Sequence, residues 1–208
     1  MEHQIVVVGI GPGAPQYLLP AAREVIERGK VLVGGRRALE SYARPGAVTQ
    51  AITADLQEVM AFIAEWRLTE DVVVLVSGDP GYYSLLPALR RCFPARLLRV
   101  IPGISSMQLA FARLALPWQD ARLVSLHGRA PQEEDLVYRA GALLGCLTDG
   151  AYNSRSVAAL LLEKGWPPEA KLYVCARLSY EDESVAETTL GEAAAAEGVG
   201  HCILVVEA

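Results

Sequence analysis

Three short Gly/Pro-rich motifs, each directly after an apolar run, contain the residues of this chain best suited to hold a ligand. They are GIGPG at 9–13, SGDPGYYS at 77–84 and PGISS at 102–106. Glycine lets a backbone pass close to a bound group, and Asp79, Ser105 and Ser106 can hydrogen-bond a ligand. Loops at the carboxyl ends of parallel strands share one edge of a sheet, where α/β proteins bind ligands. The motifs therefore predict a ligand-binding edge, although local capping would also explain the two serines and the aspartate.

The first motif resembles a dinucleotide-binding turn only in its spacing. Gly9, Gly11 and Ala14 match G-x-G-x-x-A, but that use requires an acidic residue about 20 positions later to bind the ribose. The second apolar run, KVLVGGRR, carries no acidic residue. Pro12 and Pro15 also remove two amides that would face a pyrophosphate. No GK[ST] sequence occurs, which excludes a P-loop. The motif therefore favours close approach of a flat or small group over phosphate binding.

Composition narrows the classes of protein further. The chain has 208 residues, of which 52% are hydrophobic and 21% charged, as is typical of α/β proteins. Its net charge of -5 disfavours a protein that binds nucleic acid over a broad surface. No apolar run approaches the roughly 20 residues of a membrane span, and the first residues show no secretory signal. We therefore expect a cytoplasmic protein that contacts neither membrane nor nucleic acid.

The four cysteines predict buried free thiols. Cys92, Cys146, Cys175 and Cys202 form no C-x-x-C pair, and each lies in or beside apolar sequence. Small buried thiols are common in cytoplasmic proteins, whereas zinc sites and disulfide frameworks show closer or regular spacing. We expect no metal site.

The elements that position the motifs alternate between short apolar runs and helical patterns. Strands are predicted at 4–8, 30–33, 47–50, 71–77 and 96–101, and helices at 17–27, 36–42, 55–66, 84–92 and 105–114. After Leu116–Pro117–Trp118 the pattern changes: further strands are predicted at 122–126, 145–148, 171–177, 184–189 and 202–207, and helices at 131–140, 154–164 and within TTLGEAAAAEG. The pattern predicts two α/β lobes, 1–116 and 117–208, the first with a mainly parallel sheet and the second with a mixed one.

The three motifs together resemble the tetrapyrrole (corrin/porphyrin) methylases. GIGPGAP, SGDPGYYSL and VIPGISSMQLAFARLALPW agree with that family in order, spacing and strand context, and the resemblance covers essentially the whole chain. It implies an S-adenosylmethionine-dependent enzyme of two α/β lobes with the active cleft between them. The segments VLVGGRRALE, SLHGR, LTDG and ARLSYEDESV most resemble the members that methylate C5 of cobalt-precorrin-7 or precorrin-6Y in cobalamin biosynthesis.

Other functions stay open at this point. A methylase acting at another ring position, or a diphthine-synthase-like methylase, would share the three motifs. A nucleotide-binding oxidoreductase or a non-catalytic regulator would belong to different classes.

The resemblance also implies roles for particular residues. The expected cofactor contacts are Pro12, Gly78, Asp79, Tyr82, Ser105 and Ser106 in the first lobe, with Thr148, Asp149 and Ala176 near the adenine in the second. Relatives often carry Glu where this chain has Ala176, so no role of that carboxylate is transferred. Members are typically homodimers, and a C15-methylating decarboxylase is the expected functional partner.

A sulfonium methyl group is already activated, so methyl transfer requires alignment more than acid–base groups. His127 is the candidate base for removing a proton from the substrate; the alternative is a strand-end histidine bonded to a main-chain carbonyl. Gly11 is expected to make room for the macrocycle. A corrinoid carries several carboxylates, for which arginine is suited. The candidates are Arg36, Arg37, Arg129 and Arg155, of which Arg37 and Arg129 rank first because they follow glycines at strand ends. A solvated surface position is the alternative for each.

Overall fold

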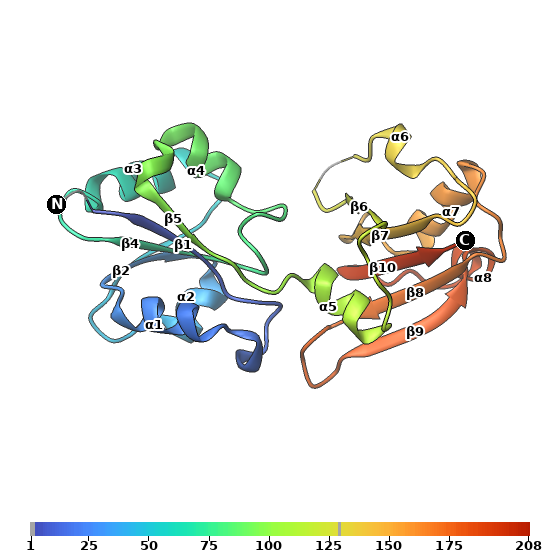
Figure 1. The fold of residues 1–208 in the computed structure, drawn as a ribbon, viewed down its shortest axis with the longest axis horizontal. Coiled ribbons are helices and arrows are strands. Elements are labelled where there is room, and N and C mark those ends of the chain that lie inside the picture. Colours follow the sequence, from blue (N-terminus) through green and yellow to red (C-terminus); the bar gives the residue numbers. More distant parts are fainter. Residues whose placement is uncertain (1–2, 129) are drawn as a thin grey trace. The chain divides into compact units, whose positions relative to one another are not determined.

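A five-stranded parallel sheet forms the centre of the first of two α/β units in the computed structural model, which describes residues 3–128 and 130–208 (Figure 1). Its strands are β1 (Ile5–Gly9), β2 (Val31–Gly34), β3 (Val48–Ala51), β4 (Val72–Val76) and β5 (Leu98–Ile101). They lie in the order β3-β2-β4-β1-β5, and every neighbouring pair is parallel. The sheet therefore has all its carboxyl ends at one edge, as predicted.

Helices cover both faces of this sheet (Figure 1). Helices α1 (Pro20–Arg28) and α2 (Arg36–Tyr42) cover one face, and α3 (Leu56–Trp66) and α4 (Leu86–Cys92) the other. Successive strand residues point to opposite faces, so Val6 packs with Ile26 of α1 while Val7 packs with Ile63 of α3. Burial on both faces is the reason why the strands read as unbroken apolar runs. Short 3₁₀ turns, η1 (Pro15–Tyr17) and η2 (Ala95–Leu97), complete the unit.

The second unit contains a mixed sheet. Its strands are β6 (Arg122–Ser125), β7 (Leu143–Leu147), β8 (Lys171–Ala176), β9 (Ser184–Thr189) and β10 (Cys202–Glu207), in the order β6-β7-β10-β8-β9. Only β6 and β7 pair in parallel; β10 is antiparallel to β7 and β8, and β9 to β8. The short connections between the last strands produce this mixed pairing, which confirms the expectation.

The described residues of the second unit form the helices α5 (Ser106–Arg113), α6 (Glu133–Leu136), α7 (Ser154–Glu163) and α8 (Leu190–Ala195). Helices α7 and α8 each begin with a capping box, Asn153 with Ser156 and Thr189 with Glu192. Leu161 of α7 packs in one core with Leu144 of β7. The predicted helix at 131–140 is reduced to the single turn α6, because this polar stretch offers few apolar residues to bury.

The two units divide between Ser105 and Ser106, whereas the sequence pattern changes near residue 116. Helix α5 accounts for the difference, because Met107 and Phe111 pack against Gly145 of β7. A Cβ on Gly145 would lie 2.7 Å from Met107 Sδ and 3.1 Å from Phe111 Cε2. Neighbouring strand residues face opposite sides of a sheet, so α5 covers the face opposite to that of α7.

The cysteine prediction is wrong at one position. Cys146, Cys175 and Cys202 are buried in the second unit, but Cys92 is exposed because it is the last residue of α4, where the helix reaches the surface. No helix in the described part of the chain is long and apolar enough to cross a membrane.

Candidate functional site

The three Gly/Pro motifs meet at the carboxyl edge of the first sheet. Strand β1 lies between β4 and β5, so the loops that follow these strands are neighbours. Gly11 and Gly78 form a two-way bridge: the Gly78 N–H donates to the Gly11 oxygen at 2.9 Å, and the Gly11 N–H donates back at 3.4 Å. The first two motifs are thus joined through main-chain atoms.

Glycine is required where the motifs touch. A Cβ on Gly103 would lie 2.2 Å from the Gly78 carbonyl oxygen, and one on Gly9 would lie 2.6 Å from the same atom. Gly11 and Gly78 have φ angles of +80° and +67°, which other residues rarely adopt. The sequence analysis missed Gly9 and Gly103 as site residues; their places inside the quoted motifs were the available signal.

Asp79 connects the second motif to the third. Its Oδ1 accepts the N–H of Gly81 at 2.7 Å, and its Oδ2 accepts the N–H of Gly103 at 3.1 Å. The Asp79 carbonyl also accepts the N–H of Tyr82 at 3.2 Å. The expected local turn is therefore present, and the same carboxylate holds a second loop. Each carboxylate oxygen keeps a lone pair for another donor.

Other predicted residues lie at or near this edge in sequence. Pro12 is half-buried in the first loop, and Ser105, only 6% exposed, lies close to Gly78: a Cβ on the glycine would be 3.4 Å from its Cα. Ser106 is the first residue of α5. The ring of Tyr82 lies edge-on to that of Tyr83 with centroids 4.8 Å apart.

Tyr83 is a residue that the sequence analysis missed. It is 45% exposed and has a φ angle of +47°. A bulky residue in the left-handed region costs free energy, and such strained residues cluster at turns and functional sites. Nothing in the sequence pattern distinguishes it from its neighbour Tyr82.

Arg36 and Arg37 begin α2 immediately after β2, at the same sheet edge as the three motifs. Both side chains are exposed, and neither forms an ion pair with another described residue. They are therefore available to an acidic ligand. Arg155, in the first turn of α7, is also exposed, while Arg129 lies outside the described residues.

In the second unit, Asp149 ties together the loops that follow β6 and β7. Its Oδ2 accepts the N–H of Gly128 at 2.9 Å, and its Oδ1 accepts those of Ala151 at 2.9 Å and Tyr152 at 2.8 Å. These amides, Gly128 first, hold the pKa of Asp149 below its usual 3.8. The Asp149 carboxylate is thus occupied by the unit's own backbone.

The Thr148 hydroxyl is also occupied by hydrogen bonds to the unit's own backbone. Thr148 is buried, and its hydroxyl donates to the Cys202 carbonyl at 2.7 Å and accepts the Cys202 N–H at 2.9 Å. Ala176 ends β8, half-buried, and pairs with Cys202 of β10 and Ser184 of β9. Any hydrogen bond from Thr148 or Ala176 to a ligand therefore falls to main-chain atoms.

His127 lies at the end of β6 with its ring exposed. Its Nδ1 is 3.2 Å from the Thr148 carbonyl oxygen, so the alternative role of a strand-end histidine is present. When Nδ1 carries the proton, Nε2 keeps a free lone pair and can act as a base. The two readings of this residue are compatible.

The ring of His201 lies 6.2 Å from that of His127, centroid to centroid. His201 has a φ angle of +51°, and its N–H donates to the Asp149 carbonyl at 3.3 Å. A Cβ on the preceding Gly200 would lie 2.9 Å from the same oxygen, which explains the glycine. His201 was not predicted from the sequence, where its only signal was its place directly after Gly200.

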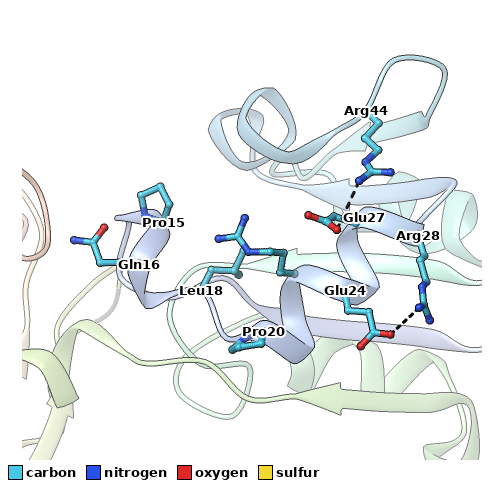
Figure 2. Close-up of a pocket in the computed structure, with 9 residues that line it drawn as sticks. Pro15, Gln16, Leu18, Pro20, Glu24, Glu27, Arg28 and Arg44 are labelled. Carbon is cyan, nitrogen blue, oxygen red and sulfur yellow. Dashed lines mark ion pairs between the residues drawn. The ribbon is translucent and has the colours of Figure 1, made fainter.

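A hollow of about 520 Å³ lies elsewhere on the first unit (Figure 2). It is lined by Pro15, Gln16, Leu18, Pro20, Arg23, Glu24, Glu27, Arg28 and Arg44. Arg28 pairs with Glu24 at 2.9 Å and Arg44 with Glu27 at 3.7 Å, as the dashed lines show. The hollow contains none of the predicted site residues, and its charges largely neutralise each other.

The fold and the joined glycine motifs define an α/β protein whose first unit brings three glycine loops together at one sheet edge. Residues 4–194 match the model of the Tetrapyrrole (Corrin/Porphyrin) Methylases, and the chain belongs to this family.

Curated relatives agree with this assignment. The cobalt-precorrin-7 C(5)-methyltransferase of Salmonella typhimurium is 34% identical over 162 residues, covering 77% of this chain and 79% of that protein. A probable cobalt-precorrin-7 C(5)-methyltransferase of Methanocaldococcus jannaschii is 29% identical over 197 residues, covering 91% of each.

Solved structures confirm the predicted fold. The cobalt precorrin-4 methyltransferase CbiF matches with a TM-score of 0.82 at 18% identity, over 98% of this chain and 94% of that one. The precorrin-6Y methylase CbiE of Archaeoglobus fulgidus matches with a TM-score of 0.73 at 24% identity, over 99% of this chain and 97% of that one.

Proposed function

We propose that this chain is an S-adenosylmethionine-dependent C-methyltransferase of cobalamin biosynthesis that methylates C5 of cobalt-precorrin-7 or the corresponding cobalt-free precorrin. Two relatives that are 34% and 29% identical to it, over 77% and 91% of its length, carry this activity in their names. The observation that carries the proposal within the structure is the joining of three glycine motifs by Gly11, Gly78, Asp79 and Gly103 at one sheet edge.

The residues present fit S-adenosylmethionine. The ligand combines a cationic sulfonium and ammonium group with ribose hydroxyls, and the edge offers main-chain carbonyls, amides and the Asp79 carboxylate. Glycines at 9, 78 and 103 keep side chains away from that surface. We assign Pro12, Gly78, Asp79, Tyr82, Ser105 and Ser106 to cofactor binding. Thr148, Asp149 and Ala176 are proposed as further contacts, made through main-chain atoms because both polar side chains are already bonded.

The cofactor supplies a methyl group that is already activated by its sulfonium. The chain's part is to hold donor and acceptor in line and to exclude water, a task that requires no nucleophilic side chain. His127 Nε2 is proposed to take the proton that the substrate loses, with Nδ1 held by the Thr148 carbonyl. Gly11 is proposed to make room for the macrocycle. Arg36 and Arg37, joined by Arg129 and Arg155, are proposed to bind its carboxylates.

The assembly and location expected from the resemblance are also proposals. We propose a cytoplasmic homodimer whose functional partner is a C15-methylating decarboxylase. In support, a Sinorhizobium relative named precorrin-6Y C(5,15)-methyltransferase [decarboxylating] is 33% identical over 164 residues, but this chain covers only 39% of its length. Light scattering after size exclusion tests the dimer; a monomeric mass at working concentration contradicts it.

Two measurements test the activity. Isothermal titration with S-adenosylhomocysteine should show binding, and the lack of binding at millimolar ligand would remove the cofactor assignment. Incubation with cobalt-precorrin-7 and methyl-labelled cofactor should yield a product with one added methyl group at C5 by NMR. A label at another ring carbon would identify a methylase of different position, and bound cofactor without turnover of any precorrin would identify a regulator.

A further inference from the structure

The Glu183 carboxylate connects the loop between β8 and β9, residues 177–183, to helix α5. Arg113 Nε donates to Glu183 Oε1 at 2.5 Å, and Arg113 Nη2 donates to Oε2 at 3.2 Å. The same Oε2 accepts the N–H of Ser179 at 2.6 Å. Glu183 therefore joins the end of α5 to the base of the loop through three hydrogen bonds, all within the second unit.

This contact is bidentate and less exposed than the other ion pair of the loop. The Glu183 side chain is 20% exposed, and Arg113 binds it with two nitrogens in a fork. Arg113 is the main reason why the pKa of Glu183 lies below its usual value. By contrast, Arg177 and Asp182 of the same loop pair at 2.9 Å with side chains 55% and 64% exposed, so water screens them.

The loop itself has a backbone that needs support. Arg177 and Ser179 have φ angles of +53° and +75°. These angles lie in the left-handed region, which is unfavourable in free energy for residues other than glycine. The N–H of Ser179 is the group that Glu183 binds. Leu178 between them is buried. The carboxylate thus stabilises a strained turn directly where it leaves β8.

The two segments that Glu183 connects are adjacent in sequence to proposed cofactor residues. Ala176 immediately precedes the loop, and α5 begins at Ser106. Met107 and Phe111 already fix α5 against β7, as Gly145 shows, so the helix is the fixed partner and the loop is the part that is held.

We propose that Glu183 is a positioning residue for cofactor binding: by holding the strained loop against Arg113, it fixes the main chain from Ala176 to Ser179 in the conformation that contacts S-adenosylmethionine. The inference rests on the proposed function, because it assigns a residue to the same cofactor. Glu183 acts through the loop and touches no reacting atom.

Glu183→Gln tests the proposal, with Glu187→Gln as the matched control. Glutamine keeps the size of the side chain but loses the charge that holds Arg113. The dissociation constant of S-adenosylhomocysteine should rise at least about tenfold, measured well below the melting temperature of the variant. Glu187 pairs with Lys171 at 3.8 Å on the same hairpin and is 60% exposed, so its variant should bind like the wild type.

A double-mutant cycle with Arg113→Met separates positioning from general stability. If Glu183 acts through Arg113, the double variant should bind no more weakly than the weaker single variant. Arg113→Lys keeps the charge without the fork, so it should fold and bind with intermediate affinity even if Glu183→Gln does not fold.

The outcomes also distinguish the two proposals. A wild type that binds S-adenosylhomocysteine and a folded Glu183→Gln variant of lower melting temperature but equal affinity would overturn the positioning role alone. Wild-type affinity in Arg113→Lys together with additive losses in the cycle would do the same. A wild type that does not bind would overturn the proposed function, and the positioning role with it.

Discussion

Asp79 Oδ2 accepts the N–H of Gly103 at 3.1 Å, and this bond joins the loop after β4 to the loop after β5 across the end of β1. The other oxygen of the same carboxylate holds the N–H of Gly81. One half-buried side chain thus holds together two motifs that are distant in sequence. The geometry gives Asp79 a task in assembling the edge as well as the proposed task of contacting the ligand.

Replacing Asp79 with alanine should separate the two loops. The variant loses two hydrogen bonds to a charged acceptor, so the free energy of unfolding should fall by about 1–3 kcal/mol in urea titrations. The affinity for S-adenosylhomocysteine should fall at least about tenfold in isothermal titration, because the edge is no longer preformed.

Asp55→Ala is the control for this variant. Asp55 caps α3 by accepting the N–H groups of Gln57 and Glu58, so its loss should cost about 1 kcal/mol of stability. It should leave the affinity unchanged. Equal affinities in the two variants would show that Asp79 has no special place in binding.

Gly103→Ala should disrupt the same edge by steric overlap. Its Cβ would lie 2.2 Å from the Gly78 carbonyl oxygen and 2.8 Å from Gly9 Cα, and both are backbone atoms that cannot rotate away. We expect a loss of more than about 2 kcal/mol in unfolding free energy, with weakened cofactor binding. Gly35→Ala meets no atom within 4 Å and should change stability by less than about 1 kcal/mol. A Gly103→Ala variant as stable as Gly35→Ala would contradict the close approach.

The sequence predicted the first sheet well because its strands are buried on both faces, which leaves long apolar runs that local pattern can reveal. It also predicted that the three Gly/Pro motifs would meet at one sheet edge, because three turns followed three such runs. The unit against which α5 packs could not be predicted from the sequence. Its apolar stripe shows that one side is buried, but not that Met107 and Phe111 would choose Gly145 of the second sheet.

The other contacts of the candidate site could not be predicted from the sequence, because they depend on pairing between strands that are distant in sequence. His201 comes beside His127 only because β10 pairs with β7, a register that no local pattern encodes. The hydrogen bond from the Gly128 N–H to Asp149 likewise depends on the pairing of β6 with β7. Exposure is similarly non-local, which is why Cys92, with apolar neighbours, was predicted to be buried.

Thiol reactivity should reflect that difference. Burial raises the pKa of Cys146 and Cys175 to about 12, and it also raises that of Cys202. Since the thiolate is the reactive form, these three should react with Ellman's reagent only on unfolding. Cys92 is exposed and should react in the native protein. The Cys92→Ser variant should therefore show no rapid phase; a rapid phase that persists would contradict the buried positions.

Arg37→Glu should weaken substrate binding without affecting the cofactor. The side chain is exposed at the start of α2, on the sheet edge of the three motifs, and reversal of its charge would repel a polycarboxylate. We expect KM for the corrinoid to rise about tenfold or more, with the affinity for S-adenosylhomocysteine unchanged.

Arg90→Glu provides the comparison for that charge reversal. Arg90 is also exposed, but it lies in the last turn of α4, which runs back toward the opposite edge of the sheet. Its variant should keep the wild-type KM. If both variants raised KM equally, the effect would come from net charge and not from a site at the carboxyl edge.

Asp149 should make the stability of the protein depend on acid pH. The N–H groups of Gly128, Tyr152 and Ala151 favour its charged form, and His127 adds to this, so the folded pKa lies below 3.8, the ordinary value. A depressed folded pKa means that the contribution to stability is complete above the unfolded pKa and is lost as the pH falls through the folded one.

Asp149→Asn keeps an acceptor oxygen but has no charge. The difference in unfolding free energy between wild type and variant, from urea titrations, should therefore be constant from neutral pH down to about pH 5 and shrink below about pH 4. A difference that stays the same down to pH 3 would mean that the three amides do not depend on the charge of Asp149.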